Sequence, residues 1–534
     1  MNTKYRNCYH TLAGLSICLL LVGAVLSGCT KKYTDINTSK DNLSADNISS
    51  NLVGQAFAES EYAGLSPTPS FQRAQNLFAD IYAQYFATTQ PSFQSDEFFE
   101  VGQWSDFAFQ YFYSSAAPQL FFVRNYTRAH DMPVAYAIAS IWRVEIYHRM
   151  TDYWGPIIYS NFGNGKTSVA YDAQEDIYHD FFNVLDSATA VLKQHPGENA
   201  FGSNDLIYNG DADKWLTFAN SLRLRLAMRV AYVDPALAKA QAEKAVQDGV
   251  MLDNSENAGV LSTTNNVNNL SSITYHYEFA MSASMESVLV GYNDPRLSVY
   301  FAEARGGGGY IGVRNGLTTA DRPSSLTVNS SFVSLRWMPY YMGGPNPPNR
   351  VMCAAEVYFL RAEGALRGWN MNGTAMDLYN EGITASLKED RVDASDAEIN
   401  QYIESTNMPI ALNDKWNSPP MTNIPVKYDA SGSFENQLEQ IITQKWLALY
   451  PDGWEAWAER RRTGYPKGYA LINSLNPNIN IYGMMRRLKF TESEVANNEQ
   501  AVEDARKLLN GDDVNYTRVW WDAKPLNLFP KPTN

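Results

Sequence analysis

Residues 214–227 read KWLTFANSLRLRLA, and this stretch decides how the middle of the chain folds. Its apolar side chains recur at spacings of three and four residues, so that a helix would gather them on one face: Trp215, Ala219, Leu222 and Leu226. The acidic residues just before it, at 211 and 213, are suited to accept hydrogen bonds from the free N–H groups of a first helical turn. The sequence therefore predicts a helix that starts here and packs its apolar face into a core.

The same spacing predicts helices elsewhere in the chain. One carries Ala135, Ile138, Trp142 and Ile146 and is expected to stop near residues 151–152, before Gly155-Pro156. Two helices of about 15 residues joined by a short turn form an αα-hairpin of nearly tetratricopeptide length. The predicted helices span residues 174–193, 213–233, 235–248, 353–367, 374–389, 434–450 and 491–509.

Long stretches rich in Asn, Gly, Ser, Pro and aromatic residues separate these helices. Stretches of this length are normally functional or contain small strands. We expect a mainly α fold: a tetratricopeptide-like helical-hairpin scaffold with a large irregular, loop-rich, ligand-binding half that contains short strands. In a single domain over 51–534, the hairpins are expected at about 72–250, 353–389 and 434–450, and the irregular half at about 250–350, 390–433 and 451–534.

The N-terminus has the pattern of a bacterial lipoprotein signal. Lys4 and Arg6 precede an uncharged stretch of about 16 residues that ends in Leu26-Ser27-Gly28-Cys29. The alternative is a transmembrane anchor, but the run is short for a span of about 20 residues. We expect residues 1–28 to be a signal peptide, Cys29 to be lipidated (a palmitate-type anchor), and the polar residues 29–50 to be a tether.

The net charge argues against one class of ligand, and the cysteine content argues against internal disulfides. The formal net charge is −14, which argues against nucleic acid as a ligand, because phosphate binding relies on clustered Lys and Arg. Cys353 is the one cysteine beyond Cys29, so no internal disulfide is expected. Its apolar helical surroundings favour a buried, inert thiol.

The sequence shows no catalytic or cofactor signature. The six His residues form no His-Glu-x-x-His motif, and Gly163–Thr167 resembles a phosphate loop whose first glycine is replaced by Ser160. Gly307–Gly312 matches Gly-x-Gly-x-x-Gly but opens no helix. Acidic pairs such as Asp96 and Glu97 leave a glycoside hydrolase as a minor alternative. We expect no enzyme activity, no cofactor and no metal.

Several segments resemble the SusD/RagB family of outer-membrane nutrient-binding lipoproteins. Residues 214–227 are the most specific match, and together the segments cover essentially the whole mature chain. The others, in the family's order, are 33–37 (YTDIN), 151–160 (TDYWGPIIYS), 356–363 (EVYFLRAE), 444–450 (QKWLALY), 455–466 (EAWAERRRTGYP), 486–488 (RRL) and 519–522 (VWWD).

The resemblance implies a lipid-anchored, non-enzymatic binder on the outer membrane, exposed at the cell surface. It would act as a lid on a SusC-like TonB-dependent transporter and pass oligomers into it. Ser39-Lys40 stands where the family usually has a proline after the tether motif, and Thr30-Lys31-Lys32 lacks the acidic run linked to surface export. The matching motifs are mostly structural: Trp215, Phe218 and Leu222 are expected in the core, and Arg460, Arg461 and Arg462 are expected to pair with scaffold carboxylates.

Aromatic residues outside helices are the candidates for ligand contacts, because flat rings stack on the C–H faces of sugars. The alternative for each ring is that it packs under its own loop. The ligand classes that remain are oligosaccharides and, as some relatives bind, oligopeptides, which would favour backbone-pairing edges. The candidates are Trp337, Tyr340 and Tyr341 in the Gly/Pro-rich 334–345 segment, then Tyr310, Tyr275, Tyr277, Phe98, Phe99 and Trp104.

Overall fold

The computed structural model of the protein describes residues 50–67, 70–274, 276–337 and 346–531. The predicted mainly α fold is confirmed: helices supply most of the regular structure, and the strands are short. Residues 54–534 form one compact unit. In the other unit, residues 1–53, the structure describes residues 50–53, which form the first turn of helix α3 (Ser50–Gly64).

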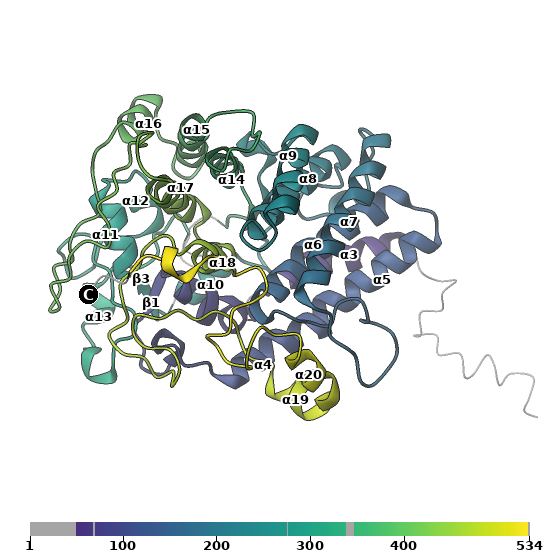
Figure 1. Ribbon diagram of the computed structural model, residues 1–534, viewed down its shortest axis with the longest axis horizontal. Coiled ribbons are helices and arrows are strands. Elements are labelled where there is room, and N and C mark those ends of the chain that lie inside the picture. Colours follow the sequence, from purple (N-terminus) through teal and green to yellow (C-terminus); the bar gives the residue numbers. More distant parts are fainter. Residues whose placement is uncertain (1–49, 68–69, 275, 338–345, 532–534) are drawn as a thin grey trace, which may run out of the picture. The chain divides into compact units, whose positions relative to one another are not determined.

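The longest helices pack in consecutive pairs, as hairpins do. Figure 1 shows α6 beside α7 and α8 beside α9, while α14 lies against both α15 and α17. The helices of this scaffold are α5 (Ala117–Ala129), α6 (Pro133–Trp154), α7 (Gln174–Gln194), α8 (Ala212–Arg229), α9 (Pro235–Asp248), α14 (Ala354–Leu366), α15 (Ala375–Leu387), α17 (Phe434–Leu449) and α18 (Gly453–Thr463).

Helix α8 begins and packs as the sequence predicts. The Asp211 carboxylate accepts hydrogen bonds from the backbone N–H groups of Asp213 and Lys214, at 3.0 and 3.1 Å. Trp215, Phe218 and Leu222 are fully buried. The Trp215 indole donates to Asp205 Oδ2 at 2.7 Å, which satisfies the one polar atom of the ring in the core.

Helix α6 runs two residues further than predicted, to Trp154. It stops at Gly155, whose φ of 79° lies in the left-handed region that glycine tolerates best. The predicted helix over 491–509 is instead two short helices, α19 (Glu492–Asn497) and α20 (Glu499–Arg506), which meet at Asn498.

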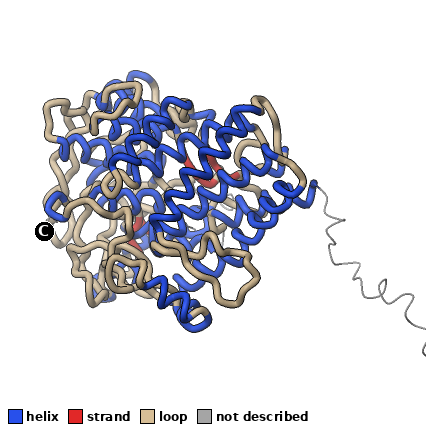
Figure 2. The backbone as a smooth tube through the Cα atoms, turned by 45° about the vertical axis from the view of Figure 1, so that its right-hand side comes forward, coloured by secondary structure: helices blue, strands red, loops and turns tan. Residues whose placement is uncertain are grey.

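The loop-rich part gathers on the side opposite helices α5–α9, at the left in Figure 2. The strands form two antiparallel ribbons. β1 (Phe86–Thr88) with β3 (Phe279–Met281) lies in the loop-rich part, and β2 (Ala258–Val260) with β4 (Asn349–Met352) lies against the scaffold, where the Val351 carbonyl accepts from Arg149 and Arg225. Short helices occupy much of the remainder: the π-helix Gln72–Asp80, α4 (Gly102–Tyr111), the π-helical turn Phe112–Ala116, α10 (Asn269–Thr274), α11 (Ala283–Gly291), α12 (Leu297–Tyr300), α13 (Leu326–Asn329) and α16 (Asp396–Ile403).

A network of buried charges joins the helices of the scaffold. Arg225 of α8 donates to both oxygens of Glu356 on α14, at 2.8 and 2.7 Å, and to Glu145 on α6 at 3.3 Å. All three side chains are fully buried. Because a buried charge is stable only when its partners are close and well oriented, these contacts fix the relative positions of three helices.

Helix α18 joins the same network through Arg229, one turn after Arg225. Arg229 pairs with Glu455, with Glu459 at 2.9 Å and with Asp152 at 3.2 Å. Arg462 at the end of α18 forms a fork with Glu363 of α14, with N–O distances of 2.8 and 2.5 Å. The expected irregular segment 451–534 therefore starts with a helix that is buried against the scaffold.

The three consecutive arginines of α18 differ in their partners. The expected pairing with scaffold carboxylates is confirmed for Arg462 and is wrong for the other two. Arg461 donates to the backbone carbonyls of Asp152 and Arg486, at 2.5 and 3.0 Å, and Arg460 donates to the carbonyl of Tyr82 at 2.6 Å. Successive helical residues point in different directions, so only Arg462 faces α14.

Two further expectations concern Cys353 and the membrane. The Cys353 side chain is buried, and burial raises the pKa of its thiol to about 11, so the thiol stays protonated and unreactive at neutral pH. Among the described residues, none of the helices combines the length and the apolar character that a membrane span requires.

Replacing Arg229 tests the buried network. Arg229→Met should lower the free energy of unfolding by about 3–5 kcal/mol, because Glu455, Glu459 and Asp152 would lose a shared buried partner. Lys507→Met is the control: its ion pair with Asp504 is exposed, and the change should leave the free energy of unfolding almost unchanged. Urea denaturation measures both. Similar small losses in the two variants would contradict a structural role for the network.

Candidate ligand-binding site

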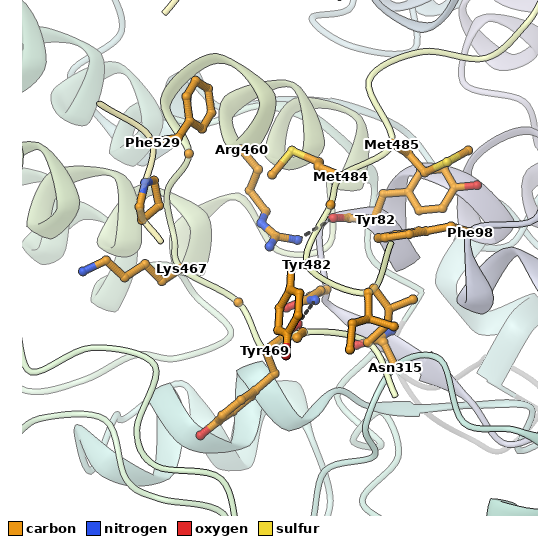
Figure 3. Close-up of a pocket in the computed structure, with 18 of the residues that line it drawn as sticks. Tyr82, Phe98, Asn315, Arg460, Lys467, Tyr469, Tyr482, Met484, Met485 and Phe529 are labelled. Carbon is orange, nitrogen blue, oxygen red and sulfur yellow. Dashed lines mark hydrogen bonds between the residues drawn. The ribbon is translucent and has the colours of Figure 1, made fainter. Parts of the chain in front are cut away.

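A pocket of about 200 Å³ lies where the loop-rich part meets the end of α18 (Figure 3). Its walls come from segments far apart in the sequence: residues 81–84 after the first π-helix, 464–471 after α18, 481–486, and 526–531 near the C-terminus. Gly464 ends α18 with a φ of 84°, and a side chain there would clash with Pro530 and Phe529. The chain therefore turns tightly enough to bring the C-terminal segment against the pocket.

Aromatic and sulfur-containing side chains form most of the apolar wall. Phe98 stands edge-on to Tyr82 at a centroid distance of 6.1 Å, and Tyr482 remains 44% exposed at the mouth. Three cationic side chains surround the ring of Phe529, from Arg486, Arg518 and Lys524, at 4.8, 5.1 and 5.7 Å. The aromatic and sulfur-containing residues labelled in Figure 3 are Tyr82, Phe98, Tyr469, Tyr482, Met484, Met485 and Phe529.

Arg460 supplies the central polar group of this pocket. Its side chain is only 8% exposed, and Figure 3 shows the guanidinium directed into the pocket beside Tyr482. Burial and the nearby Arg486 lower the pKa of Arg460 to about 10. The group is therefore still a cation at neutral pH.

Among the described lining residues Asp96 is the one carboxylate, and structural partners already occupy it. It accepts hydrogen bonds from Asn315 Nδ2 at 2.7 Å, from the Gly316 N–H at 3.1 Å and from Arg322 at 3.3 Å. Burial raises the pKa of Asp96 to about 6 in spite of these contacts. Asp96 thus holds the 315–322 segment in place, and its neighbour Glu97 pairs with the same Arg322 at 3.4 Å.

A second aromatic surface lies close to the pocket. Tyr277 and Trp416 are half-buried and pack on a core cluster that includes Ala87 of β1, Ala280 of β3 and Phe332. The Tyr277 ring stands edge-on to Phe332 at 5.1 Å, with Arg305 over it at 4.2 Å. We call Tyr277 and Trp416, with the cations beside them, the Trp416 face.

Arg314 connects this face to the pocket. Its guanidinium lies 5.6 Å from the Trp416 ring centroid and 4.7 Å from that of Tyr469, which lines the pocket. Lys415 adds a second cation, 4.6 Å from Trp416. The face therefore carries flat rings flanked by cations: the exposed Lys415, which pairs with Asp321, and the buried Arg314, which already donates to Ser418 and to the Ala470 carbonyl.

The sequence reasoning missed Trp416, although a signal for it was present. The ring stands in Asn413–Pro420, a polar and proline-containing segment outside the helices, which is the property that selected the other candidates. In contrast, no local pattern marks the pocket, because its lining residues meet only in the folded chain.

The structure separates the predicted ligand-contact residues. Phe98 lines the pocket, while Phe99 points outward and is 41% exposed. Trp104 stands against Phe93, which stacks on Phe279 of β3 at 5.2 Å. Side chains alternate along a strand, so Phe279 and Ala280 face opposite sides, and Trp104 lies across the ribbon from the Trp416 face.

Tyr310 and Trp337 lie elsewhere. Tyr310 lines an open groove of about 590 Å³ together with Arg336 and Tyr402. Trp337 is 1% exposed and packs edge-on against Tyr300 and Tyr450, at 6.0 and 5.6 Å, with Arg391 over its ring at 3.8 Å. The loop-core alternative therefore holds for Trp337. Tyr275, Tyr340, Tyr341 and Cys29 lie outside the described residues.

Metal chemistry finds no support in the described part of the chain. No group of three or more His, Cys, Asp or Glu side chains gathers there in a way that could hold a metal ion. His148 is buried in the helical scaffold, where burial and the nearby Arg225 and Arg149 lower its pKa and keep it neutral.

Comparisons with known proteins give a consistent result. A family model described as SusD-like, Susd and RagB outer membrane lipoprotein, matches residues 30–522. A chitin-binding SusD homologue from Flavobacterium johnsoniae is 37% identical with a TM-score of 0.83, over 89% of this chain and 99% of that one. A SusD homologue from Bacteroides vulgatus is 32% identical with a TM-score of 0.81, over 88% and 98% of the two chains. A SusD-like protein from Bacteroides thetaiotaomicron is 31% identical with a TM-score of 0.79, over 90% and 100%. No curated protein matches the chain.

Replacing Trp337 tests its placement in the core. Trp337→Ala should lower the free energy of unfolding by about 3–5 kcal/mol, because it leaves a cavity between Tyr300 and Tyr450. Glycan affinity per folded molecule should not change. Thermal melting and calorimetric titration of the same sample measure both, and weakened binding with an unchanged melting temperature would return Trp337 to the list of ligand contacts.

Proposed function

Because the chain belongs to the SusD/RagB family of outer-membrane lipoproteins, we propose that it captures oligosaccharides at the cell surface without cleaving them. It would deliver them to a SusC-like TonB-dependent transporter in the outer membrane. The 37% identity to a chitin-binding homologue supports a glycan as the ligand class. The lipid on Cys29 would hold the protein at the membrane.

The Trp416 face is the observation that carries the proposal for this chain. Half-exposed rings on a packed core cluster are held in place before a ligand arrives, so little conformational entropy is lost on binding. Trp416 can stack on the C–H face of a sugar ring, and Tyr277 can do so on the ring face that Arg305 does not cover. The exposed Lys415 lies beside Trp416, where it can meet hydroxyl groups. A peptide would gain less from two flat rings than from an open strand edge.

The absence of catalysis is supported by the same structure. Asp96 and Glu97, the acidic pair considered for hydrolysis, share Arg322, and Asp96 holds Asn315 and Gly316 as well. Carboxylates that are tied to the scaffold in this way are poorly placed to act as a general acid and a nucleophile on an incoming glycan.

Replacing Trp416 tests the glycan site. In calorimetric titrations with a panel of oligosaccharides, including N-acetylglucosamine oligomers, and of peptides, the proposal predicts binding of at least one glycan. Trp416→Ala should weaken that binding about fivefold, which corresponds to about 1 kcal/mol for one ring contact.

Trp369→Ala is the matched control, because Trp369 is also half-buried but packs beside Gly364 of α14 in the helical scaffold. It should leave the affinity unchanged. Binding of peptides alone, or the release of shorter glycans during incubation with the pure protein, would contradict the proposal.

The transporter role is tested in native membranes. Mild-detergent extracts should yield this protein together with a TonB-dependent barrel in near-equal amounts, because a binder without a transporter cannot move its ligand across the bilayer.

Cys29→Ala should leave the membrane fraction or accumulate as uncleaved precursor. Full membrane retention of an unlipidated Cys29→Ala protein would contradict the proposed anchor.

A further inference from the structure

Among the residues that the structure describes, the buried cation Arg460 has no partner of opposite charge. Its one hydrogen bond to the described residues runs from Nη1 to the Tyr82 carbonyl, at 2.6 Å, and it forms no ion pair with any of them. Its Nε is buried without a hydrogen-bond acceptor. Arg462, two residues on, shows the contrast, because each of its nitrogens faces the carboxylate of Glu363 or Glu459.

Three other charged side chains around the pocket have partners of their own, so they do not neutralise Arg460. Lys467 pairs with Glu439 at 2.8 Å, and Arg486 pairs with Asp522 at 3.0 Å. Asp96 is held by Arg322. The pocket is therefore cationic at its centre, although the whole chain carries a net charge of −14.

An unpaired buried charge costs free energy, so its retention needs a reason. The planar guanidinium forms charge-assisted hydrogen bonds with carboxylates. Among the described residues Nη2 donates no hydrogen bond, and the buried Nε has no acceptor. Gly468 keeps that side open, because a Cβ at this position would lie 2.5 Å from Nη2.

The size and walls of the pocket limit what can carry the carboxylate. A volume of about 200 Å³ is below the range of about 300–1,000 Å³ that encloses a drug-sized ligand. It suits one end unit of a larger molecule. The rings of Phe98 and Tyr482 offer flat apolar contact to such a unit, and Arg314 lies between this pocket and the Trp416 face.

We propose that the Arg460 pocket binds the carboxylate of an acidic sugar residue in the captured oligosaccharide. This rests on the proposed glycan-binding function and adds a specificity to it: neutral sugar units contact the Trp416 face, and an acidic unit enters the pocket. The guanidinium then gains the partner that the described part of the chain does not supply.

The experiment compares acidic monosaccharides with their neutral counterparts. Glucuronate, galacturonate and N-acetylneuraminate are titrated calorimetrically against glucose, galactose and N-acetylmannosamine. At least one acid should bind about tenfold more tightly than its neutral counterpart, and Arg460→Gln should remove that preference, because a lost charge-assisted contact is worth about tenfold in affinity. Arg128→Gln, which removes an exposed cation on α5 outside the pocket, is the matched control and should change the affinity less than about twofold.

The folded state provides a second readout. Without ligand, Arg460→Gln should melt no lower than the native protein, because it removes an unpaired buried charge. If Arg460→Gln does not fold, Gly468→Ala tests the same point, since it keeps the charge but crowds Nη2 together with Gln84 Oε1. It should also remove the preference for acids.

Several outcomes would overturn the proposal. Equal affinity for acids and neutral sugars, or an acid preference that survives in the folded Arg460 or Gly468 variant, would exclude a carboxylate site at Arg460. Displacement of the sugar acid by an equal concentration of inorganic phosphate would show a general anion site instead. If neutral oligosaccharides bind but acids bind no better, this inference fails alone; if no glycan binds at all, the proposed function fails with it.

Discussion

The pairing of Arg225 and Arg229 with carboxylates from three other helices is the constraint on which the rest of the structure depends. Glu145 of α6, Glu356 of α14 and Glu455 of α18 are separated by more than two hundred residues in all, yet they converge on one turn of α8. Hydrophobic contacts alone would allow these helices to slide, since apolar packing has little direction. Buried ion pairs prevent such sliding, because a small displacement of one helix leaves a charge without its partner.

This fixed scaffold determines where the loops can place their side chains. Helix α18 is anchored by Arg229 and Arg462, and it directly precedes the 464–471 segment of the pocket wall. Figures 1 and 3 show how the C-terminal segment returns past α18 to complete that wall. The two candidate contact regions, the Arg460 pocket and the Trp416 face, are thus built from loops whose ends are held by buried polar contacts.

The sequence predicted the scaffold well because its signal is local. The three- and four-residue spacing in α8 identifies both the helix and its buried face, and Trp215 lies where that pattern places it. The same logic fails for α18, whose charged Glu-Arg-Arg-Arg run resembles a solvated surface although the helix is buried. Burial of those charges depends on partners far away in the sequence, which no local pattern reveals.

The site was less predictable for a related reason. Gly and Pro around Trp337 suggested an exposed ring, but Tyr300 and Tyr450 cover it, and neither lies near it in the sequence. Phe98 and Tyr277 were identified by residue type, whereas Trp416 was passed over and the unpaired state of Arg460 is visible only in the folded chain.

A crystal structure of the protein with its best-binding oligosaccharide tests the central claim most directly. The account predicts sugar rings stacked on Tyr277 and Trp416, an acidic unit within hydrogen-bond distance of Arg460, and a backbone unchanged from the free protein. A ligand bound away from both the Trp416 face and the Arg460 pocket would contradict it.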